Sequence, residues 1–203
     1  MSIREMIEDE YQIGEIAFKG KNVLDIGANI GDSSVVFAKA GAKKVYAFEP
    51  LPMLHEFLDK NISINGYKEI IFPHKVGLSD KNEKIDIWAM SYGSAGASSV
   101  LHEVGKRQFS QGYIKQTLEI VEVISYFKNN NISEIDILKM DCEMCEYALL
   151  YDDSLLKYLE PEIIMLEFHA GAEKLIPVLE SCGYQISTTS KRERVGLLFA
   201  TKS

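Results

Sequence analysis

Short apolar runs alternate along the chain with amphipathic stretches, which is the pattern of a mainly parallel β-sheet whose strands are connected by helices. Strands of such a sheet are buried on both faces, so they appear as continuous apolar runs. Strands are predicted over residues 22–26, 44–48, 70–76, 84–88, 118–124, 135–140, 162–168, 184–188 and 195–200. Helices are predicted over 32–40, 53–65 and 172–182, with a shorter helix that Ser125 can cap.

These elements predict an α/β fold, a doubly wound three-layer sandwich with a mainly parallel sheet of about seven strands and an antiparallel C-terminal hairpin. We expect residues 1–203 to form a single domain. Residues 1–20 are acidic and helix-like, so we expect an N-terminal helical extension and no signal peptide. Residues 89–117 are rich in polar and small residues and have no period. We interpret them as a lid or substrate loop, with a homodimer contact as the alternative.

Composition restricts the classes of partner. Lys and Arg number 22 against 30 Asp and Glu, and the formal net charge of −8 disfavours a nucleic-acid partner. No apolar stretch approaches the roughly 18 residues of a membrane span, so we expect no membrane partner. The three cysteines are an odd number, and we expect them to be reduced thiols of a cytoplasmic protein.

The strongest candidate for a binding motif is the turn after the first predicted strand. Its glycines, Gly27 and Gly31, stand four residues apart, whereas a dinucleotide-binding turn has the spacing G-x-G-x-x-G. Glycine lets the backbone turn sharply and approach a ligand, because it tolerates positive φ and has no Cβ. Asp25 precedes the turn, where a carboxylate would repel a pyrophosphate but suits a ligand with an ammonium group. The motif therefore disfavours an NAD-linked enzyme.

A second motif follows the next predicted strand. Glu49 ends that strand, and an acid at this place can accept hydrogen bonds from both ribose hydroxyls of a nucleoside. Pro50 then makes the chain turn. At the end of the third predicted strand, Val76, Gly77 and Leu78 are candidates for contact with adenine, and Asp80 could accept from its exocyclic amine. A plain turn explains this third segment equally well.

Ionisable residues gather at the ends of two later strands. Lys139 and Asp141 are two apart and share one face of the sheet, so Asp141 is the expected partner of a buried Lys139. The turn that follows adds two acids, and the next strand ends in an acid and a histidine: Glu143, Glu146, Glu167 and His169. These side chains could form an active site, or they could be a structural ion-pair network that braces the two strands.

The glycine turn with Asp25, followed by Glu49, resembles the first two motifs of class I S-adenosylmethionine-dependent methyltransferases. The block from Lys139 to Glu146 resembles the K-[IM]-D-x-E-G-x-E block of the FkbM-type methyltransferases. Met144 and Cys145 depart from the small residues common there, which puts the close backbone approach permitted by that glycine in doubt. The resemblance covers roughly residues 20–170.

The resemblance implies S-adenosylmethionine as the cofactor, with its methionine end among Asp25, Gly27 and Gly31 and its ribose on Glu49. The full set of residues implied to bind it is Asp25, Gly27, Ala28, Asn29, Gly31, Asp32, Glu49, Pro50, Gly77, Leu78 and Asp141. The family is associated with O-methylation of sugars and other small natural-product hydroxyls, so we expect a small-molecule hydroxyl acceptor. The residues implied to be catalytic are His169, Asp141 and Glu143, of which His169 or a carboxylate would accept the hydroxyl proton.

Other functions remain open at this point. A non-catalytic nucleoside-binding module and an RNA or protein methyltransferase on the same core are the alternatives. Cys142 and Cys145 form a C-x-x-C that could be a redox pair or half of a zinc site, but no second ligand pair has suitable spacing. A hard divalent cation bound by Asp141, Glu143 and Glu167 is a further alternative. We expect no metal ligands among the site residues.

Overall fold

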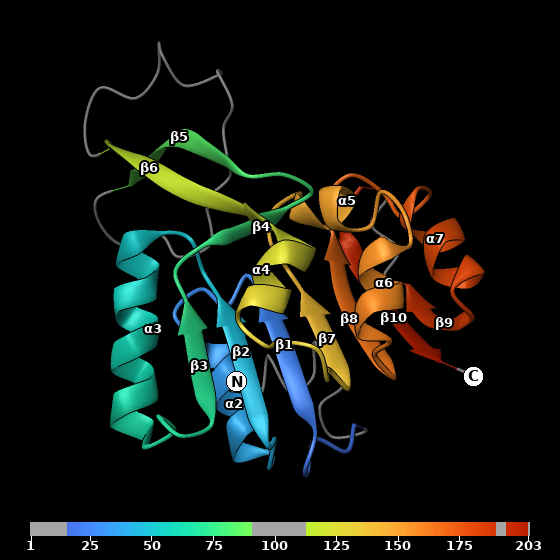
Figure 1. The fold of residues 1–203 in the computed structure, drawn as a ribbon, viewed down its shortest axis with the longest axis horizontal. Coiled ribbons are helices and arrows are strands. Elements are labelled where there is room, and N and C mark those ends of the chain that lie inside the picture. Colours follow the sequence, from blue (N-terminus) through green and yellow to red (C-terminus); the bar gives the residue numbers. More distant parts are fainter. Residues whose placement is uncertain (1–15, 91–112, 190–193, 203) are drawn as a thin grey trace.

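The centre of the fold is a seven-stranded sheet with the order β3-β2-β1-β7-β8-β10-β9 (Figure 1). The computed structural model describes residues 16–90, 113–189 and 194–202. The strands are β1 (Asn22–Ile26), β2 (Lys44–Phe48), β3 (Ile71–His74), β7 (Ile137–Met140), β8 (Ile163–Phe168), β9 (Tyr184–Thr189) and β10 (Gly196–Lys202). Among the described residues of this sheet, the pairs from β3 to β8 are parallel. The strand β10 runs antiparallel to both of its neighbours, β8 and β9. The predicted fold class is confirmed.

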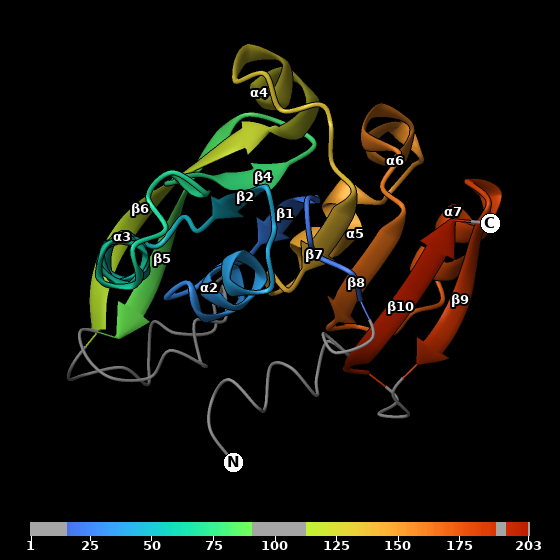
Figure 2. The same cartoon turned by 90° about the horizontal axis from the view of Figure 1, so that it is seen from below.

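Helices cover both faces of the sheet (Figure 2). They are α2 (Asp32–Lys39) and α3 (Pro52–Asn65) on one face, and α4 (Val123–Asn129), α5 (Cys145–Leu149), α6 (Ser154–Leu159) and α7 (Leu175–Ser181) on the other. The continuous apolar strands supply both cores, because successive side chains point to opposite faces. In β1, Val23 packs toward α2 and α3, while Leu24 packs into the core beneath α4, α6 and α7.

A smaller sheet, with the order β4-β6-β5, lies beside the main one. Its strands are β4 (Gly77–Ser79), β5 (Glu83–Met90) and β6 (Tyr113–Glu122). The sequence predicts β5 and β6 as strands, but it does not predict β4 or the separate sheet. The predicted loop 89–117 is too long at both ends, because Ala89 and Met90 pair with Ile114 and Tyr113. Residues 91–112 lie outside the described residues.

Two further predictions are corrected at element ends. The short helix α4 begins at Val123 and is capped by Glu122, whose carboxylate accepts from the backbone N–H groups of Ile124 and Ser125 at 3.0 and 2.8 Å. Ser125 therefore lies inside the helix and is not its cap. Of the predicted N-terminal helical extension, residues 16–20 are described and contain no helix. Phe18 is buried there and stacks on Phe37 of α2.

A buried ion pair joins the two central strands. Asp25 of β1 and Lys139 of β7 are paired in register, with 0% and 2% of their surfaces exposed, and Lys139 Nζ lies 3.1 Å from Asp25 Oδ1. Asp141 Oδ2 also lies within ion-pair distance of Lys139 Nζ, at 4.0 Å, so Asp141 is a partner as expected, but Asp25 is the closer one and the sequence did not reveal it. Burial lowers the pKa of Lys139, but the charges of Asp25 and Asp141 outweigh it, so the pKa is raised above its ordinary value.

Two serine hydroxyl groups of α2 donate hydrogen bonds to the carboxylate of this ion pair. Asp25 Oδ2 accepts hydrogen bonds from Ser33 Oγ at 2.7 Å and from Ser34 Oγ at 2.6 Å, and Lys139 Nζ donates to the carbonyl of Gly27 at 2.9 Å. One buried carboxylate thus fixes the first turn of α2 to β1 and β7. A buried charge keeps its ionised form only with such partners.

Lys139→Met should lower the free energy of unfolding by about 3–5 kcal/mol, because it leaves the Asp25 carboxylate buried without its cation. The matched control is Lys157→Met, which removes an exposed helical pair with Asp153 and should change stability little. Urea denaturation followed by circular dichroism measures both variants. Equal losses in the two would contradict a special role for the buried pair.

Candidate functional site

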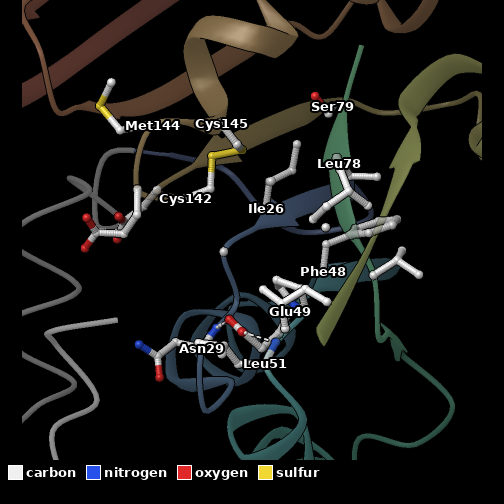
Figure 3. A pocket seen from close by; sticks show the side chains of 18 of the residues that line it. Ile26, Asn29, Phe48, Glu49, Leu51, Leu78, Ser79, Cys142, Met144 and Cys145 are labelled. Carbon is white, nitrogen blue, oxygen red and sulfur yellow. Dashed lines mark hydrogen bonds between the residues drawn. A yellow bond between two sulfur atoms is a disulfide. The ribbon is translucent and has the colours of Figure 1, made fainter. Parts of the chain in front are cut away.

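A cavity of about 740 Å³ opens at the carboxyl ends of β1, β2, β7 and β8, beneath the smaller sheet (Figure 3). This is the edge at which ligands bind in open α/β sheets. The predicted site residues that line it are Gly27, Asn29, Asp32, Glu49, Pro50, Gly77, Leu78, Asp141, Glu143 and His169. The sequence reasoning missed Ser33 and Phe48, which also line it. Their positions next to Asp32 and Glu49 in the sequence were the available signal.

Three of the predicted binding residues lie behind the cavity wall. Asp25 is wholly buried in the ion pair with Lys139, and it holds Ser33 and Ser34. Ala28 is also wholly buried, and Gly31 is the N-cap of α2. The expectation that Asp25 meets a ligand ammonium group is therefore not supported by its position. Asp32 lines the cavity instead, and burial raises the pKa of its carboxyl.

Gly27 holds the turn close to the neighbouring strands. Its φ is +79°, and a Cβ added there would lie 1.7 Å from the backbone oxygen of Asp141. The backbone N–H groups of Gly27 and Ala28 both donate to the carbonyl of Phe48, at 3.0 and 2.9 Å. Because no side chain fits between these segments, glycine is required here, and the turn lies against the ends of both β2 and β7.

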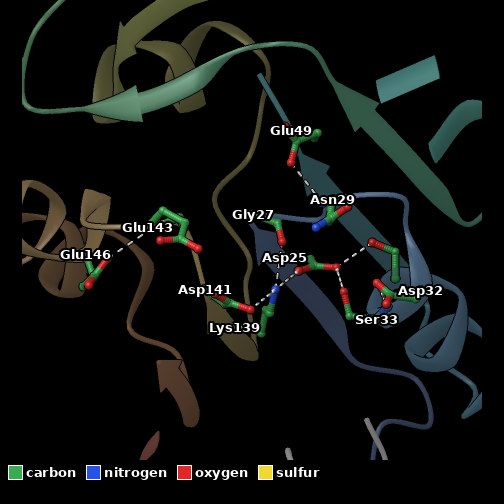
Figure 4. Close-up of polar contacts among 12 residues, drawn as sticks. Asp25, Gly27, Asn29, Asp32, Ser33, Glu49, Lys139, Asp141, Glu143 and Glu146 are labelled. Carbon is green, nitrogen blue, oxygen red and sulfur yellow. Dashed lines mark hydrogen bonds and ion pairs between the residues drawn. The ribbon is translucent and has the colours of Figure 1, made fainter. Parts of the chain in front are cut away.

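Glu49 lies 5% exposed at the end of β2 and faces the turn (Figure 4). Its two carboxylate oxygens accept from the backbone N–H groups of Leu51 at 2.8 Å and Asn29 at 3.0 Å. Burial raises the pKa of Glu49 to about 7, although both hydrogen bonds act in the opposite direction. This group therefore changes its charge near neutral pH.

Apolar side chains form the cavity wall next to Glu49. Phe48 and Leu78 point into this part of the cavity in Figure 3, and Val76 also lines it. A flat ring can be accommodated against such a surface. Asp80 lies outside the lining, is exposed, and accepts from the hydroxyl of Ser79 at 3.0 Å. That geometry favours the plain turn over a contact between Asp80 and a ligand.

The cavity is also lined by His169, which lies among carboxylates. His169 Nε2 lies 3.9 Å from Asp141 Oδ1 and 3.8 Å from Glu143 Oε2, and Nδ1 lies 3.0 Å from Glu146 Oε1. The hydrogen bond with Glu146 is the main reason why the pKa of His169 rises to about 9; the charges of Glu143 and Glu167 add to it, and burial opposes it. A ring that is protonated at neutral pH is not ready to accept a proton. The role of His169 as a base stays a prediction.

Cys142 and Cys145 form a disulfide in the cavity wall, so the expectation of reduced thiols is wrong for this pair (Figure 3). Sulfurs bonded to each other cannot bind zinc as thiolates. The cytoplasmic location, which relied partly on reduced thiols, stays a prediction without that support. Cys182 is a free thiol.

The disulfide encloses two residues in the left-handed region, Glu143 with φ 52° and Met144 with φ 88°. Met144 stands where the block quoted above has glycine, and its side chain is 51% exposed. The backbone therefore takes the path that glycine would take, despite the larger side chain. Left-handed backbone in residues other than glycine costs about 1–3 kcal/mol and persists where the surroundings impose it.

Met144→Gly should raise the free energy of unfolding by about 1 kcal/mol, because it removes the steric cost of positive φ. The control is Ile64→Gly on the exposed side of α3, which should lower it by about 1 kcal/mol. Thermal unfolding without reductant measures both. A loss in Met144→Gly similar to that of the control would show that this backbone is not strained.

Comparisons with known proteins agree with this geometry. The sequence model described as the Methyltransferase FkbM domain matches residues 25–186. Protein arginine N-methyltransferase 1 of Oryza sativa subsp. indica is 46% identical over 54 residues, which are 27% of this chain and 14% of that protein. The chain thus matches only a small part of that relative.

Two solved structures share the fold. The methyltransferase FkbM of Methylobacillus flagellatus has a TM-score of 0.61 at 14% identity, over 94% of this chain and 46% of that one. The magnesium protoporphyrin IX methyltransferase of Synechocystis, with bound S-adenosylmethionine, has a TM-score of 0.54 at 14% identity, over 98% of this chain and 79% of that one. Such low identities show the fold alone. Separately, no helix among residues 16–90, 113–189 and 194–202 has the length and apolar character to cross a membrane.

Proposed function

The chain belongs to the FkbM methyltransferase family, and from this premise we propose that it transfers the methyl group of S-adenosylmethionine to a hydroxyl of a small molecule such as a sugar. The family resemblance found in the sequence is confirmed. One observation carries the proposal: a single cavity is lined both by the nearly buried carboxylate of Glu49 and by His169 with its neighbouring carboxylates. Its volume of about 740 Å³ suits a nucleoside cofactor together with a small acceptor.

The residues present fit this cofactor. Glu49 would accept from the two ribose hydroxyls, since carboxylate oxygens have lone pairs beyond those used by Leu51 and Asn29. Phe48 and Leu78 would contact the adenine ring. Asp32, at the first turn of α2, is placed better than Asp25 to meet the ammonium group, because only Asp32 lines the cavity.

When bound, the cofactor supplies a methyl group on a positively charged sulfur. An acceptor hydroxyl would take that methyl group in exchange for its proton, which would pass to solvent water. In-line attack requires a fixed acceptor. Asp141 and Glu143 would hold it through hydrogen bonds from its hydroxyls, and the apolar wall next to Glu49 would keep water from the nucleoside side.

A second candidate function is methylation of a protein guanidinium group. Asp141, Glu143 and Glu167 line the acceptor end of the cavity, and carboxylates pair well with a guanidinium. The short match to a protein arginine N-methyltransferase agrees with it. Incubation with labelled cofactor and either sugars or arginine-containing peptides separates the two functions. A nucleoside-binding module would bind the cofactor and label neither acceptor.

Calorimetric titration with S-adenosylhomocysteine tests the cofactor, with NAD as the control ligand. We expect micromolar binding of S-adenosylhomocysteine alone. Glu49→Gln should weaken it by at least about tenfold, because the hydrogen bonds to a charged acceptor become bonds to a neutral one. Glu119→Gln, on the exposed side of β6, should leave it unchanged. If the unaltered protein binds neither ligand, the proposed function fails.

The same binding should depend on pH through Glu49. Its pKa is about 7 without ligand, and ribose hydroxyls that donate to the carboxylate favour the ionised form, so the pKa falls on binding. Affinity should therefore be full above pH 7 and fall by up to about tenfold per unit below it. Titrations at pH 6, 7 and 8 measure this slope. A slope that persists in Glu49→Gln would assign it to another group.

A further inference from the structure

Three side chains at the acceptor end of the cavity form a set of possible metal ligands. Asp141 follows β7, Glu167 lies in β8, and His169 follows that strand. Each offers one ligand atom, and these atoms all lie within 4.8 Å of one another. Ligands at about 2.0–2.2 Å from one cation lie roughly 3–4 Å apart, so small side-chain rotations would bring these three onto it.

The buried Glu146 provides a separate observation. It is 0% exposed and is not one of the three ligands, yet its Oε1 accepts from the backbone N–H of His169 at 3.1 Å and lies 3.0 Å from Nδ1 of the same residue. This contact occupies Nδ1 and leaves Nε2 on the side of Asp141, where a bound cation would replace the Nε2 proton and release it to water. Metal-binding histidines almost always donate their other ring N–H to a carboxylate or carbonyl in this way.

Tyr147 fixes the backbone that follows His169. Its hydroxyl accepts from the N–H of Ala170 at 2.7 Å and donates to the carbonyl of Gly171 at 2.7 Å. Glu146 and Tyr147 both belong to α5, so a single short helix holds residues 169–171 directly after β8. The position of Nε2 is therefore set before any ligand arrives, which lowers the cost of binding one.

The charge at this end favours a cation. Asp141, Glu143 and Glu167 line the same part of the cavity as His169. The nearby ammonium of Lys139 offsets the charge of Asp141 only in part, because it pairs with two carboxylates. It is closer to Asp25, at 3.1 Å, than to Asp141, at 4.0 Å. Carboxylates outnumber the positive groups here, and a divalent ion would offset that excess.

We propose that Asp141, Glu167 and His169 bind a divalent cation, such as Mg²⁺ or Mn²⁺, and that this cation holds an acceptor with two adjacent hydroxyls. Two carboxylates and one imidazole suit these metals, with Mn²⁺ favoured by the nitrogen ligand. The ligand set differs from the one considered from sequence, since His169 replaces Glu143. The acceptor part rests on the proposed methyl transfer; the cation site does not.

Three protein ligands leave three of six octahedral positions for other groups. A vicinal diol can fill two of them and is thereby oriented toward the methyl group. The cation lowers the pKa of the bound hydroxyl, whose proton passes to solvent water as the oxygen–carbon bond forms and the carbon–sulfur bond breaks. No protein base is then required, which fits a His169 ring whose Nδ1 is held by Glu146.

Mn²⁺ titration of the full chain, followed by electron paramagnetic resonance at pH 8 after removal of metals with chelator, tests the site. We expect one Mn²⁺ per chain, displaced by excess Mg²⁺. Glu167→Gln and, separately, His169→Gln should weaken Mn²⁺ binding at least about tenfold. The control Glu180→Gln, on the exposed side of α7, should bind Mn²⁺ normally. Far-ultraviolet circular dichroism and S-adenosylhomocysteine binding show whether each variant is folded.

The outcomes separate the two proposals. If the unaltered protein binds S-adenosylhomocysteine but binds Mn²⁺ no more tightly than Glu167→Gln does, the cation site is overturned. The methyltransferase proposal then stays intact. Stoichiometric Mn²⁺ binding without S-adenosylhomocysteine binding supports the site and refutes the methyl transfer, together with the diol acceptor. Equal weakening in Glu180→Gln would assign the binding to surface carboxylates and also overturn the site.

Discussion

The ion pair between Lys139 and Asp25 is the constraint on which the site depends. It links the two central strands at their carboxyl ends, where the cavity opens. On one side Asp25 fixes the first turn of α2 through Ser33 and Ser34. On the other side Lys139 holds the carbonyl of Gly27. Because a buried pair is weak as a source of net stability, its value here is positional: it fixes the turn, the helix and the strand end together.

Elements with strong local signals were predicted well, and elements whose existence depends on distant partners were not. The strands β1 and β2 were predicted with their observed bounds, since each is a short, mainly apolar run between turns. The strand β4 has only three residues and exists because it pairs with β6. The helix α6, with six residues, is too short to show a helical period. Val123 continues the alternation of β6, so only the cap made by Glu122 marks the start of α4.

The same distinction holds in the site. Gly27 and Glu49 were predicted to line a ligand site because their chemistry follows from their own place at a strand end, and both line the cavity. The burial of Asp25 follows from its pairing with Lys139, far away in the sequence, which the residues alone do not give. The contact between Glu146 and His169 likewise joins distant segments. For the disulfide, the C-x-x-C spacing was visible, but the odd number of cysteines favoured the wrong interpretation.

The disulfide turn shows how the backbone can keep a family geometry after the side chain has changed. Met144 has the φ of a glycine, although a methionine in that conformation is costly. Met144 lies between Cys142 and Cys145, so their disulfide restrains the backbone on both sides of it. A glycine at this position would adopt the same backbone conformation without such a restraint. This turn leads from Asp141 to Glu146, and Glu146 orients His169. The part of the cavity around His169 therefore depends on a covalent brace, whereas the turn at Gly27 depends on the buried ion pair. Because these two parts of the cavity wall have separate supports, substitutions in the disulfide turn need not disturb the turn at Gly27.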